Sequence, residues 1–134
     1  MANIKRVSPA EAKQLLDEGW IYLDVRTEPE FAVGHPAGAH NVPVMIAGAR
    51  GMTQNADFLS LVEARYPKDA KIVVGCQAGG RSLRAAEMMS AAGYTSIIDQ
   101  RAGFGGARDP FGQVIEPGWA GAGLPVETGA APKL

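Results

Sequence analysis

Cysteine and histidine are scarce in this 134-residue sequence, which has one cysteine, Cys76, and two histidines. A single cysteine excludes an internal disulfide, and a reducing compartment would keep its thiol available for chemistry. His35 and His40 lack a third ligand nearby, so we expect no metal site. A turn-stabilising role is predicted for His35 and a surface role for His40.

The sequence also lacks an excess of charge of either sign, because it contains 13 Lys and Arg residues and 14 Asp and Glu residues. The net charge of -1 argues against nucleic acid and anionic membranes as partners, since those require a concentrated basic surface. No segment resembles a signal peptide, and no apolar run is long enough to span a bilayer. We therefore expect a single cytoplasmic domain whose partners are small molecules or proteins.

The sequence around Cys76 predicts a strand followed by a helix. Residues 72–74 form a β-branched apolar run, typical of a strand buried on both faces of a parallel sheet. Such a strand points its C-terminal end at a ligand crevice. Residues 82–92 change to helical periodicity, and Gly93 is the predicted C-terminal cap. The apolar face of this helix consists of Ala85, Met88, Met89 and Ala92.

Two glycines, Gly79 and Gly80, lie between this strand and helix. Both can adopt positive φ angles, which would turn several backbone N–H groups inward around the sulfur of Cys76. These dipoles and the partial positive charge at the helix N-terminus both favour the thiolate over the thiol. A cysteine that simply fills the end of a core strand is the alternative. That role does not need the Gly-Gly-Arg-Ser sequence that follows, so the pattern favours a nucleophile.

A helix and a strand are predicted near the N-terminus. Residues 8–11 have the capping-box pattern, with proline at the first helical position, and Gly19 would end the helix. Residues 20–25 form a strand candidate that carries Asp24 near its C-terminal end, and Arg26 follows directly. Asp24 would then face the predicted crevice.

The middle of the chain contains a second capping box, at residues 27–30, which predicts a short turn of helix. Residues 41–43 form a brief extended segment, and a loop containing glycine and methionine follows. Asn55 is the predicted cap of another helix, which stops before Pro67. The apolar face of that helix consists of Phe58, Leu61 and Val62.

The C-terminal part has a β-branched strand at residues 95–98 and a glycine-rich loop at residues 99–117. A loop this long in a small domain is often functional. Residues 118–123 are expected to form a last helical turn, and residues 127–134 a flexible tail. The alternation of strands and helices predicts an α/β fold with a mainly parallel sheet.

Several motifs follow one another in an order typical of one family. They comprise Leu23-Asp24-Val25-Arg26 with Glu28, Glu30 and Phe31; Gly34-His35 with Gly38-Ala39 and Asn41-Val42-Pro43; Cys76-x-x-Gly79-x-Arg81-Ser82; Ala92-Gly93-Tyr94; and Gly118-Trp119 with Ala122-Gly123-Leu124-Pro125-Val126. Together they resemble the rhodanese family of sulfurtransferases over nearly the whole chain.

The resemblance implies a single rhodanese domain, spanning residues 1–126, built as a three-layer α/β/α sandwich around a five-stranded, mainly parallel sheet. It also implies that Cys76 accepts a sulfane sulfur as a persulfide and passes it to a nucleophile, with no metal or organic cofactor. The family's sulfur-cradling loop maps onto Cys76, Gln77, Ala78, Gly79, Gly80 and Arg81. Supporting roles are expected for Asp24, Arg26 and Ser82.

The residues indicate the same chemistry. A thiolate attacks the outer sulfur of a donor such as thiosulfate, sulfite leaves, and the negative terminal sulfur of the persulfide needs the N–H cradle. Arg81 would hold an anionic donor or buttress the loop. Because no second cysteine exists, the acceptor must be external: cyanide, a small thiol or a protein thiol.

Three features depart from the family pattern. Pro36 precedes Ala37, whereas an aliphatic residue and then proline is the usual order. Gly75 is smaller than the residue that usually precedes the cysteine. The 101–117 segment is longer than in the simplest members; its two arginines would approach the donor or, as we favour, be solvated surface charges.

Two other functions are weighed. Phosphatases and arsenate reductases place cysteine and arginine one residue further apart, whereas Cys76 and Arg81 enclose four residues with no aspartate as general acid. A sulfur-relay or regulatory binding module that does not turn over is the other alternative. The intact loop around Cys76 favours the sulfurtransferase over both.

Overall fold

A parallel sheet forms the centre of residues 3–131, the part of the chain that the computed structural model describes. Within this part its five strands lie in the order β1-β8-β7-β2-β4, and every neighbouring pair is parallel. The strands are β1 (Lys5–Val7), β2 (Ile21–Asp24), β4 (His40–Asn41), β7 (Ile72–Gly75) and β8 (Ile97–Gln100). β7 lies at the centre and is buried throughout. The predicted five-stranded, mainly parallel sheet is therefore confirmed.

Helices cover both faces of this sheet. They are α1 (Pro9–Asp17), α2 (Glu28–Val33), α3 (Phe58–Arg65) and α4 (Gly80–Ala91). Alternate strand residues point to opposite faces. Leu23 and Val74 pack with α3 and α4, whereas Tyr22 and Val73 pack with α1 and α2. This arrangement is the predicted three-layer α/β/α sandwich.

Both predicted capping boxes form. The Oγ of Ser8 accepts the N–H of Glu11 at 3.1 Å, and the Glu11 carboxylate accepts the N–H of Ser8 at 3.0 Å. The same reciprocal pair joins Thr27 and Glu30 at the start of α2. Each cap satisfies helical N–H groups that would otherwise lack partners, which stabilises a helix by about 1 kcal/mol.

The predicted start of α3 is wrong. Asp57, not Asn55, occupies the N-cap position. The Asn55 side chain instead accepts the N–H of Asp57 at 3.0 Å and donates to the carbonyl of Pro43 at 2.9 Å, so it fixes the turn before the helix. Leu61, predicted to lie on the apolar face, is 40% exposed. Phe58 and Val62 are fully buried and account for the packing of this short helix.

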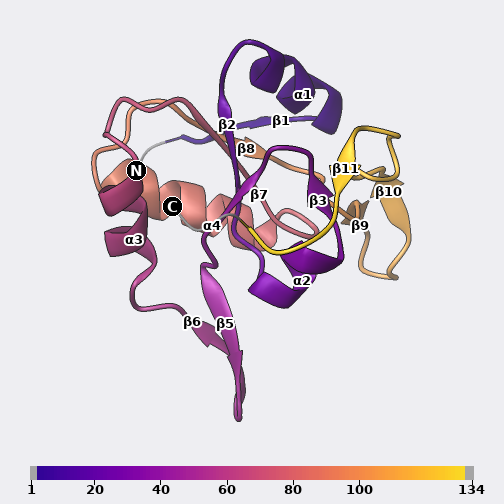
Figure 1. Cartoon of the computed structure of the whole chain (residues 1–134). Helices are drawn as coiled ribbons and strands as arrows, with labels where there is room; N and C mark the ends of the chain where they lie inside the picture. The colour runs from indigo at the N-terminus through magenta and orange to yellow at the C-terminus, as the bar shows by residue number, and fades with distance from the viewer. Residues whose placement is uncertain (1–2, 132–134) are drawn as a thin grey trace.

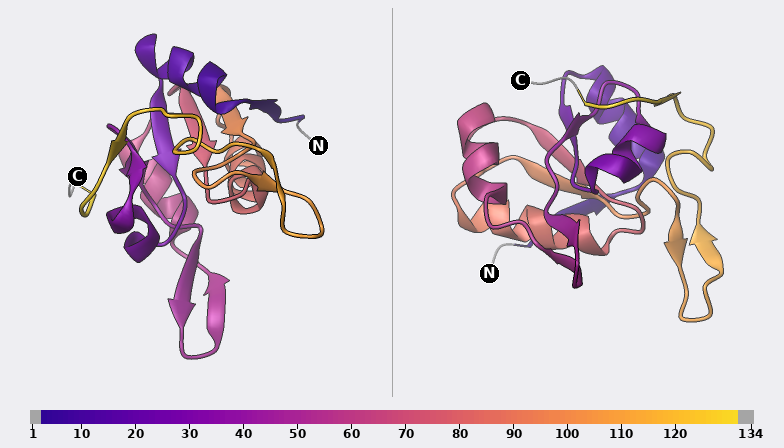
Figure 2. Two further views of the ribbon diagram at one scale, coloured as in Figure 1. Left: turned by 90° about the vertical axis from the view of Figure 1, so that its right-hand side faces the viewer. Right: turned by 60° about the horizontal axis from the view of Figure 1, so that its bottom comes forward.

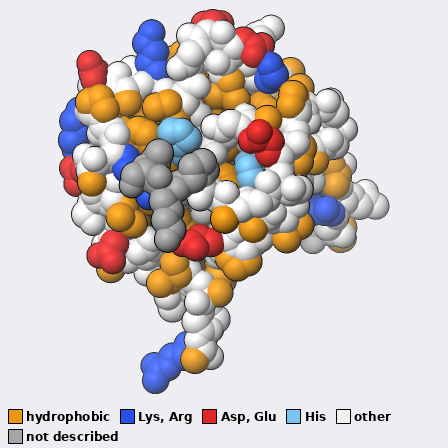
Figure 3. All heavy atoms as spheres, in the orientation of Figure 1, with side chains coloured by type: hydrophobic (Ala, Val, Ile, Leu, Met, Phe, Trp, Pro, Cys, Tyr) orange, Lys and Arg blue, Asp and Glu red, His pale blue; other side chains and the backbone are white. Residues whose placement is uncertain are grey.

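Two segments expected to be loops form hairpins. The first pairs β5 (Met45–Gly48) with β6 (Gly51–Gln54) and extends from the body of the molecule (Figure 1 and Figure 2). Figure 3 shows it as a narrow projection with a basic side chain at its far end. The second hairpin pairs β9 (Ala107–Arg108) with β10 (Val114–Glu116). Both are largely exposed, so neither has the alternating apolar pattern by which a half-buried strand is recognised.

The C-terminal segment is anchored further along than expected. β11 (Val126–Glu127) pairs antiparallel with β3 (His35–Pro36), and the N–H of Gly129 donates to the carbonyl of Ala32 at 2.8 Å. These backbone bonds hold residues that were predicted to begin a flexible tail at 127. Residues 132–134 of that tail lie outside the described part.

Residues 118–123 form the expected turn. The N–H of Ala122 donates to the carbonyl of Gly118 at 2.9 Å. Trp119 is 1% exposed, and its ring lies edge-on to that of Tyr22.

Among the described residues, no helix combines the length and apolar character that crossing a bilayer requires.

Candidate active site

Cys76 lies directly after β7, where the central strand gives way to α4. Its side chain is 2% exposed, and its Sγ accepts the N–H of Gly79 at 3.1 Å. Gly79 is the N-cap of α4 and has a φ of 103°, in the left-handed region. A Cβ there would lie 2.3 Å from the carbonyl oxygen of Arg101. Both the left-handed φ and this close contact therefore require glycine at position 79.

Gly80 differs from the prediction. It is the first residue of α4 and does not share the positive φ of Gly79. A Cβ at Gly80 would meet nothing within 4 Å. The turn therefore needs one left-handed residue, because the next residue must already be helical for α4 to begin.

The N-terminus of α4 faces the cysteine loop without a side-chain cap. Its first turn contains no acidic residue, and the helix runs for 12 residues. Uncapped N–H groups at the start of a helix favour a nearby negative charge. The loop can thus stabilise an anion next to Cys76.

The residue before the cysteine is glycine because of a tyrosine on the neighbouring strand. A Cβ at Gly75 would lie 1.9 Å from the hydroxyl oxygen of Tyr22. That hydroxyl accepts the side-chain amide of Gln100 at 3.3 Å. Burial is the main cause that raises the pKa of Tyr22, so its hydroxyl stays protonated.

Asp24 and Arg26 form a buried ion pair beside the loop. The Nη2 of Arg26 lies 2.8 Å from Oδ2 of Asp24, and both residues are at most 2% exposed. Arg26 also donates to the side chain of Gln77 at 3.2 Å and to the carbonyl of Gly34 at 2.6 Å. Its guanidinium stacks on the ring of Phe104 at 4.5 Å. The pair therefore supports the loop through Gln77.

Arg81 is held by Glu30 of α2. Two parallel hydrogen bonds of 2.7 Å and 3.0 Å join the guanidinium to the carboxylate. The bonds from Arg81 are the main cause that lowers the pKa of Glu30 to about 2. Glu30 thus completes the capping box of α2 and also buttresses the loop through Arg81.

The sequence analysis missed Arg6 and Asp99. They face each other in the register of β1 and β8, and the Nε of Arg6 lies 2.7 Å from Oδ2 of Asp99. Arg6 also donates to the carbonyl of Gly79 at 3.1 Å. Ser82, fully buried in the first turn of α4, donates to the same carbonyl at 3.4 Å. The sequence predicts the end of this strand at residue 98 and places Asp99 in the loop that follows, whereas Asp99 lies inside β8.

The glycine-rich segment after β8, whose length suggested a function, contacts the site through its backbone. The N–H of Phe104 donates to the carbonyl of Cys76 at 2.7 Å, and the N–H of Gly105 donates to that of Gln77 at 2.9 Å. A Cβ at Gly103 would lie 2.5 Å from the backbone of Gln77. The segment therefore packs against the cysteine loop and holds the carbonyls of Cys76 and Gln77 in place.

The guanidinium groups of the two arginines in the 101–117 segment bond to partners outside the cysteine loop. Arg101 pairs with Glu116 at 2.8 Å, and Arg108 donates to the carbonyl of Gly112 at 2.7 Å.

Two hollows flank the cysteine loop. One, of about 550 Å³, contains Arg81 and the methionines of the β5–β6 hairpin, and the other, of about 470 Å³, contains Gln77 and Phe104.

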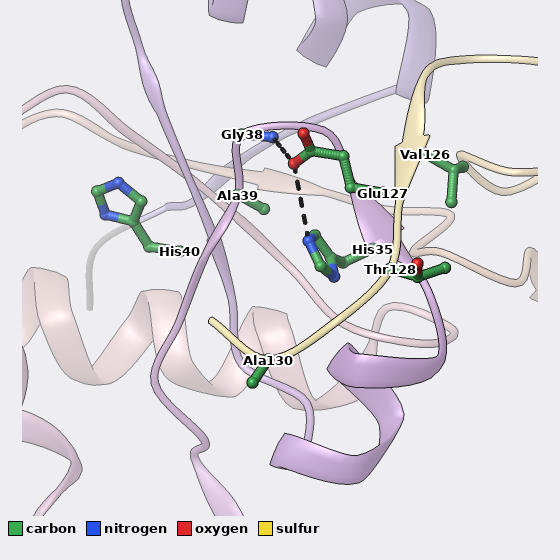
Figure 4. A pocket seen from close by; sticks show the side chains of 8 residues that line it. All are labelled: His35, Gly38, Ala39, His40, Val126, Glu127, Thr128 and Ala130. Atoms are coloured by element: carbon green, nitrogen blue, oxygen red, sulfur yellow. Dashed lines mark hydrogen bonds and ion pairs between the residues drawn. The ribbon is translucent and has the colours of Figure 1, made fainter. Parts of the chain in front are cut away.

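The two histidines line a separate cavity of about 570 Å³ (Figure 4). His35 is 5% exposed, its Nδ1 bonds to the carbonyl of Phe31 at 2.7 Å, and its Nε2 lies 3.8 Å from Glu127. His40 is half-buried and bonds to the hydroxyl of Tyr66, so its predicted surface role is wrong. No cluster of three metal-binding side chains occurs in residues 3–131.

Comparison with known proteins agrees with this geometry. The family model of the rhodanese-like domain matches residues 8–106, which include every residue of the cysteine loop. Thiosulfate sulfurtransferase 16, chloroplastic, from Arabidopsis thaliana is 42% identical over 90% of this chain and 91% of its own length. Thiosulfate sulfurtransferase 18 from the same plant is 40% identical over 76% of each chain.

Solved structures give the same result. The crystal structure of Rv0390 from M. tuberculosis superposes with a TM-score of 0.78 and 30% identity, over 96% of this chain and 100% of that one. The β9–β10 hairpin and β11 lie beyond the residues matched by the family model. The ordered motifs, the sheet and the position of the cysteine all lead to one assignment: this chain belongs to the rhodanese-like domain family.

Proposed function

We propose that this protein is a sulfurtransferase that carries a sulfane sulfur as a persulfide on Cys76. The observation that supports this most is the hydrogen bond from the Gly79 N–H to Sγ at the uncapped N-terminus of α4. A sulfur at this point has a donor aimed at it before any substrate binds. Such preorganised donors stabilise negative charge without reorganisation during the reaction.

The first step transfers sulfur to the enzyme. The Cys76 thiolate attacks the outer sulfur of thiosulfate, the new Sγ–S bond forms, and the S–S bond of the donor breaks. Sulfite leaves with the bonding electron pair. A thiolate and a dianion thus become a persulfide anion and a sulfite dianion, and charge is conserved. A persulfide donor reacts in the same way and leaves as a thiolate.

The loop then holds the persulfide anion. We assign this role to the backbone of Gln77, Ala78, Gly79 and Gly80 together with Arg81. Arg81 acts as a buttress in this scheme, because its guanidinium is bound to both oxygens of Glu30.

The second step needs an acceptor from outside. The chain has one cysteine, so no internal thiol can resolve the persulfide. Cyanide attacks the terminal sulfur, the S–S bond breaks, its electrons return to Sγ, and thiocyanate leaves. A small thiol or a protein thiol reacts equivalently and becomes the persulfide.

Steady-state kinetics with thiosulfate and cyanide test this proposal. We expect thiocyanate formation with ping-pong kinetics, and its complete loss in Cys76→Ser, which replaces only the sulfur atom. Persulfide formation without turnover would instead identify a relay or regulatory module. Turnover of an aryl phosphate would favour the phosphatase alternative. The cytoplasmic location stays a prediction.

A further inference from the structure

The carbonyl of Gly79 lies at the meeting point of three donors on the far side of the cysteine loop. It accepts from Nη2 of Arg6 at 3.1 Å, from the hydroxyl of Ser82 at 3.4 Å and from the N–H of Leu83 at 3.3 Å. Only the last of these belongs to the ordinary hydrogen bonding of a helix. Arg6 reaches this carbonyl from β1, 73 residues away in sequence.

We propose that Arg6 and Asp99 are positioning residues for sulfur transfer, which hold the peptide between Gly79 and Gly80 so that its N–H is aimed at the persulfide. This inference rests on the proposed function of Cys76. The peptide is trans, as are all peptide bonds of the described residues, so its C=O and N–H point in opposite directions. A carbonyl held toward Arg6 therefore directs the Gly80 N–H away from Arg6.

The conformation of Gly79 explains what that N–H faces. Left-handed residues in such turns bring successive backbone N–H groups to one side, where they form a small concave site for an anion. The Gly79 N–H already bonds to Sγ at 3.1 Å. The Gly80 N–H is the next donor along the chain, and the persulfide adds the next sulfur atom. Arg6 thus controls the donor that the reaction intermediate needs.

Asp99 holds Arg6 in place for this task. Its carboxylate is fully buried, and burial is the main cause that raises its pKa, while Ser82 and Arg6 act in the opposite direction. Its Oδ1 has no hydrogen-bond partner among the described residues. An incompletely paired buried carboxylate is costly for a fold, which points to a role at the adjacent loop.

Arginine is suited to this position for a geometric reason. Its Nε donates to Asp99 at 2.7 Å while its Nη2 donates to Gly79 at 3.1 Å, so one planar group bridges two acceptors. A lysine supplies a single compact charge and cannot reproduce this fork.

Four variants test the inference: Arg6→Met, Arg6→Lys, Asp99→Asn and, as the matched control, Arg101→Gln. The control also removes a guanidinium–carboxylate pair, because the Arg101 side chain bonds to Glu116 and not to a residue of the loop. Persulfide formation on Cys76 is followed in a single turnover with thiosulfate by rapid quenching and intact-protein mass spectrometry. The amide signals of Gly79 and Gly80 are followed by ¹⁵N NMR.

We expect Arg6→Met and Arg6→Lys to form the persulfide about ten-fold more slowly, the effect of losing one hydrogen bond that serves a charged group. Asp99→Asn keeps an acceptor for Arg6, so we expect it to slow persulfide formation less than Arg6→Met does. The Gly80 amide signal should shift in both Arg6 variants. Arg101→Gln should show the wild-type rate. Should Arg6→Met fail to fold, Arg6→Lys, which keeps the charge beside Asp99, carries the same test.

A wild-type rate of persulfide formation in Arg6→Lys would overturn the inference, because a positive charge without the two hydrogen bonds would then be sufficient for that rate. Unchanged Gly79 and Gly80 signals in the Arg6 variants would overturn it as well. Failure of the wild type to take up sulfur from thiosulfate or from a persulfide donor contradicts the proposed function instead. The amide signals would still show whether Arg6 holds the loop.

Discussion

The two glycines of the cysteine loop should respond very differently to the same substitution. In Gly79→Ala, the new Cβ must adopt a φ of 103° and lies 2.3 Å from the carbonyl oxygen of Arg101. A left-handed conformation costs a residue with a Cβ about 1–2 kcal/mol, and overpacking adds about 1–3 kcal/mol. We therefore expect Gly79→Ala to lower the free energy of unfolding by about 2–5 kcal/mol.

Gly80→Ala is the matched comparison, because the residue is next in sequence and adds the same methyl group. A Cβ there meets nothing within 4 Å, and the residue is already helical. Alanine should therefore leave the free energy of unfolding unchanged or raise it by about 0.5–1 kcal/mol. Urea denaturation of the two variants and the wild type measures both effects. Equal destabilisation by the two substitutions would refute the assignment of the left-handed turn to Gly79 alone.

Three further predictions concern the residues around the loop. Arg26→Met leaves the carboxylate of Asp24 buried without its partner and should lower the free energy of unfolding by about 3–5 kcal/mol, measured by urea denaturation. Gly75→Ala places a methyl group 1.9 Å from the hydroxyl of Tyr22 and should cost about 1–3 kcal/mol in the same assay, whereas a neutral outcome would contradict that contact. Glu30 has a pKa lowered from 4.5 to about 2, so its stabilising contribution is present above pH 4.5 and is lost as the pH falls toward 2. The stability difference between wild type and Glu30→Gln should therefore vanish across that pH range, and a constant difference would argue against the ion pair.

Local patterns in the sequence were sufficient for the elements that position the cysteine. The apolar run before Cys76, the helical periodicity after it and the two capping boxes depend on residues close together in the chain. Their physical signals are burial periodicity and satisfaction of helix N–H groups, and both can be recognised within a few residues.

The features that the sequence did not predict depend on contacts between distant residues. Arg6 and Asp99 meet because β1 and β8 are neighbours in the sheet, 93 residues apart in sequence. The bidentate contact of Arg81 with Glu30 spans 51 residues. The exposed hairpins pair residues that are close in sequence, but they lacked a signal because solvated strands need no apolar alternation. Among the glycines of the loop, only the three-dimensional turn distinguishes Gly79 from Gly80.

The central claim is that Cys76 carries a sulfur atom between a donor and an acceptor. Intact-protein mass spectrometry under non-reducing conditions tests it most directly, after incubation with thiosulfate and removal of the excess. We expect the wild type to gain the mass of one sulfur and to lose it again with cyanide or dithiothreitol, while Cys76→Ala gains nothing. A wild type that gains no sulfur from thiosulfate or from a persulfide donor, or an equal gain by Cys76→Ala, would contradict the claim.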